Sequence, residues 1–468
     1  MSHQHRHDQP DGDGARGSRA GRADRADHAD HAARAHDAGS GSMSRRNLLA
    51  VTGGLLMVAA APGTAAASTT RPAAVGTPQS VPLPGAARAS RLQRRTTLVH
   101  ADLHNHTVLS DGDGDPEQAF ASMREAGLDV AALTDHATLS AGLLGILDPL
   151  LPPGASEITG ISPRDFELVE KLADAADDPG SYTAIRGFEW SHPLLGHANV
   201  WFTEDFTDVL DAFAMDRFYD WLTSERWGLF GHRRGGAAGV AGFNHPGREP
   251  RRFSEFALQP KALDQMVSME IFNRRDDYLF RGWSDGTPSP LVTCLNAGWR
   301  TGLTGVTDEH GDDWGFHEGK GRSGLWVTEN TRAGVLAAMR ARRFFATRVS
   351  GLRFDATADD VHMGGTLDVA RRDVRFAVDL DRGPQWDGKP LLIQVLRPGT
   401  DIPEVADVIP ARTGGLTRFT VSLDVADGDW VVLRVSDPDR PNDAPGPEGH
   451  PCNDWGVAYS SPWWLEPA

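Results

Sequence analysis

Residues 97–107 read Thr-Leu-Val-His-Ala-Asp-Leu-His-Asn-His-Thr, an apolar run that ends in two histidines two positions apart. The run Thr97–Asp102 predicts a short β-strand. Side chains two positions apart on extended backbone point to the same side, so His104 and His106 can reach one metal ion. We therefore expect a metal-binding group at the carboxyl end of this strand.

The residues that follow predict a β-α-β unit with polar side chains at both strand ends. Asp111 lies in a Ser-Asp-Gly turn that presents its carboxylate. A helix is expected from Asp115, because Pro, Glu and Gln follow it in the order typical of a helix start. A second apolar strand over 128–133 then leads to Asp135 and His136.

Five more apolar strands carry histidine or carboxylate side chains near their ends. These residues are Glu189 after 182–188, His197 before 200–202, His245 after 237–243, Glu270 within 266–272, and Asp308 and His310 after 302–306. Strands that alternate with helical segments and end in such residues are typical of a (β/α) barrel, whose site lies at the carboxyl ends of its strands. No role follows for Glu270, because it lies inside its strand.

An ordinary explanation exists for any single histidine, which after a strand is usually a hydrogen-bonded surface residue. Twelve histidines follow residue 67, however, and six of them fall near strand ends. Repetition of that kind favours a shared site, with His197 as its weakest member because its strand could be an ordinary hairpin. The six predicted to be ordinary are His100, His192, His232, His317, His362 and His450.

In order and spacing, the motifs resemble those of the PHP (polymerase and histidinol phosphatase) superfamily over residues 96–348. The motifs are Asp102–His106, Ser110–Gly112, Thr134–His136, His245-Pro246 and Asp308–His310. The resemblance implies an α/β fold, a distorted (β/α)7 barrel that holds two or three divalent metal ions. It implies one site of His104, His106, Glu189 and Asp308, a second of bridging Glu189 with His197 and His245, and a third of Asp111, His136 and His310.

The same resemblance leaves the metal open among Zn, Mn and Fe, with Mg possible. An oxygen ligand such as Asp111 can shift the preference from Zn²⁺ towards Mn²⁺ or Fe²⁺. The two-domain, exported arrangement also resembles the branch of carbaryl-hydrolase-like metallohydrolases. In that branch a carboxylic or carbamate ester is an alternative substrate.

The ligand set predicts hydrolysis by a metal-bound hydroxide as the catalytic group. Two ions about 3.5–4 Å apart can share a water, lower its pKa and hold it for attack on phosphorus. We expect a phosphatase of small or nucleotide phosphate esters, or a 5′-3′ exonuclease-like enzyme. The alternatives are a hydrolase of non-phosphate esters or carbamates and a metal-binding envelope protein without catalysis.

Three residues outside the ligand set are candidates for the site. Asp135 is expected either to orient a ligand histidine from behind or to face the turn at the strand end. Arg248 and Arg300 are candidate phosphate clamps, with an ordinary surface position as the alternative for each.

The chain of 468 residues has a formal net charge of −17. A surface this acidic repels phosphate backbones at long range. It therefore favours a small-molecule or short phosphate-ester substrate over stable coating of nucleic acid. Cys294 and Cys452 are the two cysteines, too few for a cysteine-based zinc site. The sequence indicates no oligomeric state.

The first 95 residues predict a low-complexity extension, a targeting signal and a linker. Residues 1–43 are a low-complexity extension of His, Asp, Arg, Ala and Gly, and Met43 is an alternative start. Residues 44–67 begin with a twin-arginine pair, continue with a short apolar run and end in Ala-Ala-Ala, which predicts a Tat-type export signal and a secreted or cell-envelope protein. The apolar run is too short for a membrane span. Residues 68–95 predict a flexible linker.

Beyond the barrel, residues 349–468 show alternating apolar and polar positions punctuated by Gly and Pro. The alternation predicts a smaller all-β, sandwich-like domain. The closing Trp463-Trp464 is expected to pack at the junction with the barrel, with carbohydrate or substrate binding as the alternative.

Overall fold

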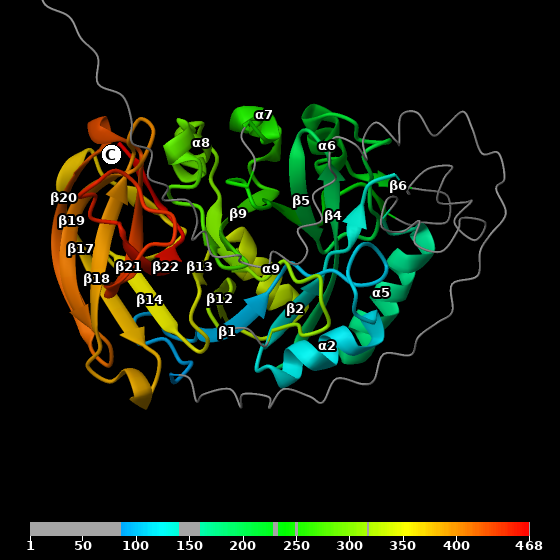
Figure 1. Ribbon diagram of the computed structural model, residues 1–468, viewed down its shortest axis with the longest axis horizontal. Helices are drawn as coiled ribbons and strands as arrows, with labels where there is room; N and C mark the ends of the chain where they lie inside the picture. Colours follow the sequence, from blue (N-terminus) through cyan, green and yellow to red (C-terminus); the bar gives the residue numbers. More distant parts are fainter. Residues whose placement is uncertain (1–85, 140–159, 228–232, 249–250, 316–317, 468) are drawn as a thin grey trace, which may run out of the picture. The chain divides into compact units, whose positions relative to one another are not determined.

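The computed structural model describes residues 86–139, 160–227, 233–248, 251–315 and 318–467, and the predicted export signal lies outside them. Its first part is a sheet of parallel and antiparallel strands with helices packed around it (Figure 1). The strands are β1 (Thr97–Asp102), β2 (Val130–Leu133), β3 (His136–Ala137), β4 (Thr183–His192), β5 (Gly196–Trp201), β8 (Val240–Phe243), β9 (Met266–Asn273), β10 (Asp276–Asp277) and β11 (Gly302–Val306). A separate two-stranded sheet pairs β6 (Arg226–Trp227) with β7 (Arg233–Arg234).

The order of pairing brings the ends of six strands to one edge. β1, β2 and β4 are parallel, as are β8, β9 and β11. β5 runs antiparallel to both β4 and β8, so these two blocks of strands share one direction. A parallel bridge between Asn105 and Glu309 brings the chain after β11 beside the chain after β1. The carboxyl ends of the six strands and the amino end of β5 therefore lie together.

Helices cover this sheet where the sequence supplies caps and apolar faces. They are α2 (Pro116–Glu125), α5 (Pro163–Ala176), α6 (Met215–Leu222), α7 (Phe253–Phe256), α8 (Pro290–Asn296) and α9 (Arg332–Arg340), with 3-10 turns η3 (Pro260–Ala262) and η4 (Trp283–Asp285). Asp115 caps α2 as predicted, and its side chain accepts a hydrogen bond from the amide of Glu117. Phe120 and Val169, from α2 and α5, pack into one core with Leu133 of β2. No helix among the described residues is long and apolar enough to cross a membrane.

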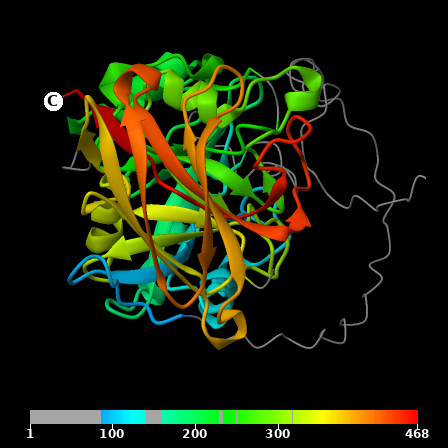
Figure 2. The same ribbon diagram turned by 90° about the vertical axis from the view of Figure 1, so that its left-hand side faces the viewer.

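The second part is built from strands in two sheets (Figure 2). One sheet holds β14 (Arg353–Ala358), β15 (Val361–His362), β17 (Arg371–Asp381) and β20 (Leu416–Asp424). The other holds β16 (Thr366–Asp368), β18 (Pro390–Arg397), β19 (Glu404–Arg412), β21 (Trp430–Pro441), β22 (Asp454–Ser460) and β23 (Trp463–Glu466), with 3-10 turns η5 (Pro384–Trp386) and η6 (Val425–Asp427) beside the strands. Phe354 and Val378 of the first sheet share a core with Ile393 and Leu433 of the second.

The two parts are joined by main-chain pairing and by a common core. β12 (Arg322–Val327) is antiparallel to β1 and to β13 (Phe344–Thr347), and β13 pairs with β22. Tyr459 and Trp464 lie in the same apolar cluster as Phe272 of β9. The sheet thus continues across residues 348 and 349, where the sequence predicts a domain boundary.

Residues 86–95, the described part of the predicted linker, are held by hydrogen bonds to both parts. Arg353 Nη1 donates to the carbonyl of Ala87 at 2.6 Å, and the amide of Leu98 donates to the carbonyl of Arg88 at 2.8 Å. The Ser90 hydroxyl donates to the carboxylate of Asp355. These contacts fix the chain immediately before β1.

His100, on β1, is buried with 6% of its surface exposed. Burial, helped by the positive charges of Arg88 and Arg322, lowers its pKa to about 3. A histidine that stays neutral in the folded state and titrates near 6.5 when unfolded stabilises the fold above pH 6.5, and that stability is lost as the pH falls. His100 therefore makes the fold sensitive to mild acid.

We expect His100→Gln to remove this sensitivity. Between pH 7.5 and pH 5, the free energy of unfolding of the natural protein should fall by about 2 kcal/mol more than that of the variant. Urea unfolding in the presence of a chelator measures both without a contribution from bound metal. Parallel pH profiles for the two proteins would show that His100 does not titrate in this way.

Candidate metal centre

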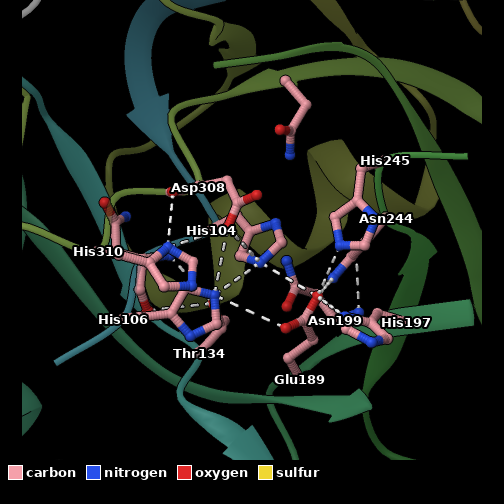
Figure 3. Close-up of polar contacts among 12 residues, drawn as sticks. His104, His106, Thr134, Glu189, His197, Asn199, Asn244, His245, Asp308 and His310 are labelled. Carbon is pink, nitrogen blue, oxygen red and sulfur yellow. Dashed lines mark hydrogen bonds and ion pairs between the residues drawn. The ribbon is translucent and has the colours of Figure 1, made fainter. Parts of the chain in front are cut away.

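All nine predicted metal ligands lie close together at the edge where the six strands end. They are His104, His106, Asp111, His136, Glu189, His197, His245, Asp308 and His310. Figure 3 labels His104, His106, Glu189, His197, His245, Asp308 and His310 among them. His104, His106 and Glu189 are fully buried. The side chains of His197 and His310 are 27% and 21% exposed, so the group opens to solvent.

Glu189, in the last part of β4, lies near five of the imidazoles, with His106 Nε2 the most distant at 3.6 Å from its Oε2. Its Oε1 lies 3.2 Å from His104 Nε2 and 3.3 Å from both His197 Nδ1 and His245 Nε2. Its Oε2 lies 2.6 Å from His136 Nδ1. Glu189 is therefore the carboxylate that several of the imidazoles share.

His104, His106 and Asp308 form one compact group of ligand atoms. The Nε2 atoms of the two histidines are 3.0 Å apart. Asp308 Oδ1 lies 3.5 Å from His104 Nε2 and 3.4 Å from His106 Nε2. Two ring nitrogens and a carboxylate oxygen that converge in this way can share one cation.

A second group gathers around Asp111, whose Oδ1 lies 3.3 Å from His136 Nε2 and 3.4 Å from His310 Nε2. His106 Nδ1 is 3.9 Å from the same oxygen. His106 therefore presents one ring nitrogen to each group. His136 likewise faces Asp111 with Nε2 and Glu189 with Nδ1, so a third group combines His136, Glu189 and His197.

Glu270 supports two of the ligands from behind. Its Oε1 lies 2.7 Å from His104 Nδ1, and its Oε2 accepts hydrogen bonds from the amide of His245 at 2.6 Å and from Asn273 Nδ2 at 2.9 Å. A carboxylate on Nδ1 holds the proton there and leaves Nε2 with its lone pair free for a metal. Glu270 thereby fixes the ring orientation of His104.

The backbone is bent at two of the ligands. His245 has a φ of 29° and Asp308 a φ of 48°, in the left-handed region that costs residues with a side chain. Each lies two residues after a strand of the parallel block, β8 for His245 and β11 for Asp308. Strain of this kind is typical of functional sites.

The electrostatics of the centre favour a positive charge in its middle. Burial raises the pKa of Glu189, but the imidazoles of His197, His136 and His104 outweigh it and hold the pKa well below its usual range. Burial lowers the pKa of His106 to about 3, with the charges of His310 and His136 acting in the same direction. Burial lowers the pKa of His136, but the carboxylates of Glu189 and Asp111 outweigh it and raise that pKa well above its usual range. Metal binding requires ionised carboxylates and neutral imidazoles, so a divalent ion bound here would displace the proton that His136 holds.

The residues present fit divalent metal ions. His106 Nδ1 and Asp111 Oδ1 are buried, and neither has a hydrogen-bond partner among the described residues. Within each group the ligand atoms lie within 4.8 Å of one another. Imidazole and carboxylate donors together suit Zn, Mn and Fe.

Asp135 faces the turn at the strand end and not a ligand histidine, which decides between the two predicted roles. Its Oδ1 accepts hydrogen bonds from the amide of Thr107 and from the Ser110 hydroxyl, each at 2.7 Å. These bonds fasten the turn that carries Asp111. Asp135 positions a ligand through the backbone.

Arg248 lies at the centre, as predicted for a phosphate clamp. Its Nη2 donates to Asp308 Oδ2 and to Asn273 Oδ1, both at 2.8 Å. Arg274 joins it, with Nε 3.4 Å from Asp308 Oδ2 and Nη2 3.2 Å from His310 Nδ1. The side chains of both arginines are 29% exposed.

Arg300 does not lie at the centre, and its prediction as a phosphate clamp is wrong. It pairs with the carboxylate of Glu466 and is 45% exposed. The reason is strand polarity, because Arg300 precedes β11 and Asp308 follows it. Residues that flank a strand lie at opposite edges of the sheet.

Asn244 and Arg274 were not predicted from the sequence, and Glu270 was noted there without a role. Asn244 Nδ2 donates to Glu189 Oε1 at 2.6 Å, beside Glu270 and Arg274. A carboxylate inside an apolar strand is rarely buried unless it is paired. The position of Glu270 in such a strand could therefore have indicated that it has a charged or hydrogen-bonding partner. No pattern in the sequence distinguishes Arg274. Among the histidines predicted to be ordinary, His100, His192, His362 and His450 lie outside the metal-ligand groups, and His232 and His317 lie outside the described residues.

No protein-family model and no curated protein matches the chain. Solved structures that it resembles include a two-domain protein from Bacteroides vulgatus containing a predicted PHP-like metal-dependent phosphoesterase, with 18% identity, a TM-score of 0.39, and coverage of 81% of this chain and all of the other. A protein from Bifidobacterium adolescentis, provisionally described as a metal-dependent phosphoesterase, has 14% identity, a TM-score of 0.26, and coverage of 46% and 88%. An amidohydrolase from Chromobacterium violaceum has 13% identity, a TM-score of 0.23, and coverage of 45% and 87%.

The first of these proteins is described as PHP-like, and that is the family that the motifs of this chain resemble. Similarity of this degree does not transfer an activity from those proteins to this chain. The chemistry of the centre rests on its own residues.

Glu270→Gln should weaken metal binding without removing a ligand. Loss of the charge behind His104 lowers the basicity of its Nε2, and changes at such supporting positions typically cost about 10–100-fold in affinity. Competition for Zn²⁺ with a chromogenic chelator measures the effect. Glu466→Gln, which removes a carboxylate far from the centre, should bind Zn²⁺ like the natural protein. Equal affinity of both variants would exclude a supporting role for Glu270.

Proposed function

We propose that this protein is a metal-dependent hydrolase of phosphate esters. The observation that carries the proposal is the set of metal-ligand groups linked through Glu189 and His106, with Arg248 and Arg274 on the outer oxygen of Asp308. We also propose that the circuit of β1, β2, β4, β5, β8, β9 and β11 is the distorted seven-stranded barrel expected from the motifs. The antiparallel β5 is the distortion.

His104, His106 and Asp308 would hold one ion, and Asp111, His136 and His310 another, with His106 Nδ1 facing the second group. Glu189, with His197 and His245, would complete a third position. Divalent ions bound here would supply an activated water and a positive charge to stabilise the oxygens of the transition state.

Arg248 and Arg274 add positive charge with which the site can recognise an anionic group. The outer oxygen of Asp308 anchors both guanidinium groups, and each keeps part of its surface open to solvent. Planar guanidinium groups match the oxygens of a phosphoryl group better than an ammonium does. A phosphate ester bound beside Asp308 would therefore be oriented by Arg248 and Arg274.

Ser191 lies close enough to His136 to suggest a nucleophile, with 2.6 Å between its Oγ and His136 Nδ1. The hydroxyl, however, donates to the carbonyl of Glu189 at 2.9 Å, and Ser191 is only 4% exposed. Its role is to hold the ring of His136 in place. The proposed reaction thus needs no covalent intermediate on serine.

The predicted export signal and the acidic net charge support two further proposals. We propose that the protein acts outside the cytoplasm and that its substrate is small or short. Neither proposal affects the chemistry of the centre.

The reaction class can be tested with the full chain after reconstitution with Mn²⁺ or Zn²⁺. We expect hydrolysis of 4-nitrophenyl phosphate or bis(4-nitrophenyl) phosphate, and loss of that activity after chelation. A parallel assay with 4-nitrophenyl acetate and an aryl carbamate gives the competing result. Turnover of the carboxylic or carbamate esters alone would contradict the proposal.

Arg274→Met should separate recognition of phosphate from hydrolysis in general. Loss of a charge-assisted hydrogen bond costs about 1.5–3 kcal/mol, so kcat/KM for the phosphate ester should fall roughly 10–150-fold. Arg300→Met, the matched control at the other edge of the sheet, should leave kcat/KM unchanged. Equal values for the two variants would rule out Arg274 as an anion-binding residue.

A further inference from the structure

Exposed apolar side chains are few among the described residues, and they occur in the loops around the metal centre. The large exposed apolar residues are Val108, Leu194, Leu210 and Phe213, with exposures of 48%, 66%, 51% and 63%. Val108 lies between His106 and Asp111. The other three lie in the turn between β4 and β5 and in the loop after β5. Such clustering beside a site commonly marks a binding surface.

His192 connects the two loops that carry the last three residues. Its Nδ1 accepts hydrogen bonds from the amides of Leu194 and Leu195, both at 3.1 Å, and its Nε2 donates to the carbonyl of Phe213 at 3.2 Å. An imidazole that accepts on one nitrogen and donates on the other is neutral. The backbone at Leu194 and the backbone at Phe213 are thereby tied to opposite sides of one ring.

The loop of Leu210 and Phe213 is a fixed turn. Asp208 Oδ1 accepts hydrogen bonds from the amides of Leu210 at 2.9 Å and Asp211 at 3.0 Å. The buried Trp190 donates its indole N–H to the carbonyl of Ala212 at 3.2 Å. A turn held in this way presents its apolar side chains to solvent at little further entropic cost on binding.

The same loops are attached to the metal ligands. The turn with Leu194 lies between Glu189 on β4 and His197 on β5. The amide of Val209 donates to the carbonyl of Thr138 at 3.0 Å, two residues after His136. The apolar side chains of Leu194, Leu210 and Phe213, called the apolar rim below, therefore lie on loops attached to the segments that carry His136 and His197.

The arginines lie towards the other side. Figure 3 shows Asp308 and His310 on one side of Glu189 and His197 on the other. Arg248 and Arg274 contact Asp308, while the apolar rim adjoins His197. A ligand that spans the centre thus meets positive charge at one end and apolar surface at the other.

We propose that the apolar rim binds the carbon-containing group of an amphipathic phosphate ester, whose phosphoryl group lies over the metal centre and the arginines. This inference rests on the proposed function and narrows its substrate class to phosphate esters of apolar alcohols or phenols. The occupant follows from the attachment of the rim to the segments that carry His136 and His197, and from the arginines at Asp308. Highly polar alcohols such as sugars would gain nothing from this surface.

The test uses a series of alkylphosphonates, methyl, butyl and octyl, which are not hydrolysed, titrated into the metal-loaded full chain. Affinity should rise with chain length, by at least tenfold from methyl to octyl, because each buried methylene favours binding. In the double variant Leu194→Ser/Phe213→Ser most of that rise should be lost, while methylphosphonate binds as before. Leu416→Ser, a partly exposed leucine on β20, is the matched control and should keep the full rise.

Phenyl, 4-ethylphenyl and 4-butylphenyl phosphate, whose leaving groups have similar pKa values, give the kinetic counterpart. KM should fall along the series in the natural protein and remain flat in the double variant, with kcat little changed. Hydrolysis without any dependence on chain length would overturn the apolar rim but leave the proposed function standing. Binding that depends on chain length without hydrolysis of any phosphate ester would leave the rim standing and overturn the function.

Two other results would also overturn the inference. A change in oligomeric state of the double variant, with chain-length dependence retained, would make the rim a contact between copies of the chain. Retained chain-length dependence together with lost binding to phosphatidylglycerol vesicles would assign it to a lipid surface.

Discussion

The buried carboxylate of Glu189 is surrounded by ring nitrogens of His104, His136, His197 and His245 at distances of 2.6–3.3 Å. A carboxylate at this depth is costly unless positive charge compensates it, and four imidazoles that carried protons together would repel one another. Divalent cations shared among them resolve both problems, because neutral imidazoles and an ionised carboxylate then face the same positive charge. The remaining structure holds these groups at short range.

The directions of the strands bring most of these residues together. Six strands end at one edge, and the reversed β5 begins there, so a hairpin adds His197 where a regular crossover would have carried the chain away. Left-handed backbone at His245 and Asp308 turns two ligands inward. Glu270 fixes the ring of His104 through its Nδ1, and Asp135 fixes the turn that carries Asp111. The pairing of β13 with β22 continues the sheet into the second part, which closes the core behind β9.

That the nine candidate ligands would lie together was predictable because most of them lie close to the end of an apolar strand, which is a local feature of the sequence. All nine lie together, and the helix start at Asp115 has the predicted cap. Contacts that depend on the path of a distant strand were out of reach. The sequence predicted Arg248 and Arg300 alike as phosphate clamps. In the structure Arg248, which follows β8, pairs with Asp308, whereas Arg300, which precedes β11, pairs with Glu466. Asn244 and Arg274, and the role of Glu270, became visible only when the strands were placed side by side.

The most direct test of the central claim is the metal content of the full chain, measured by elemental analysis after exposure to Zn²⁺ or Mn²⁺ and removal of free ions. We expect about two or three divalent ions per chain. In Glu189→Gln, which keeps the shape of the side chain but removes its charge, at least one ion should be lost while circular dichroism shows an unchanged fold. A folded natural protein that retains no metal, or a Glu189→Gln variant that retains all of it, would contradict the account.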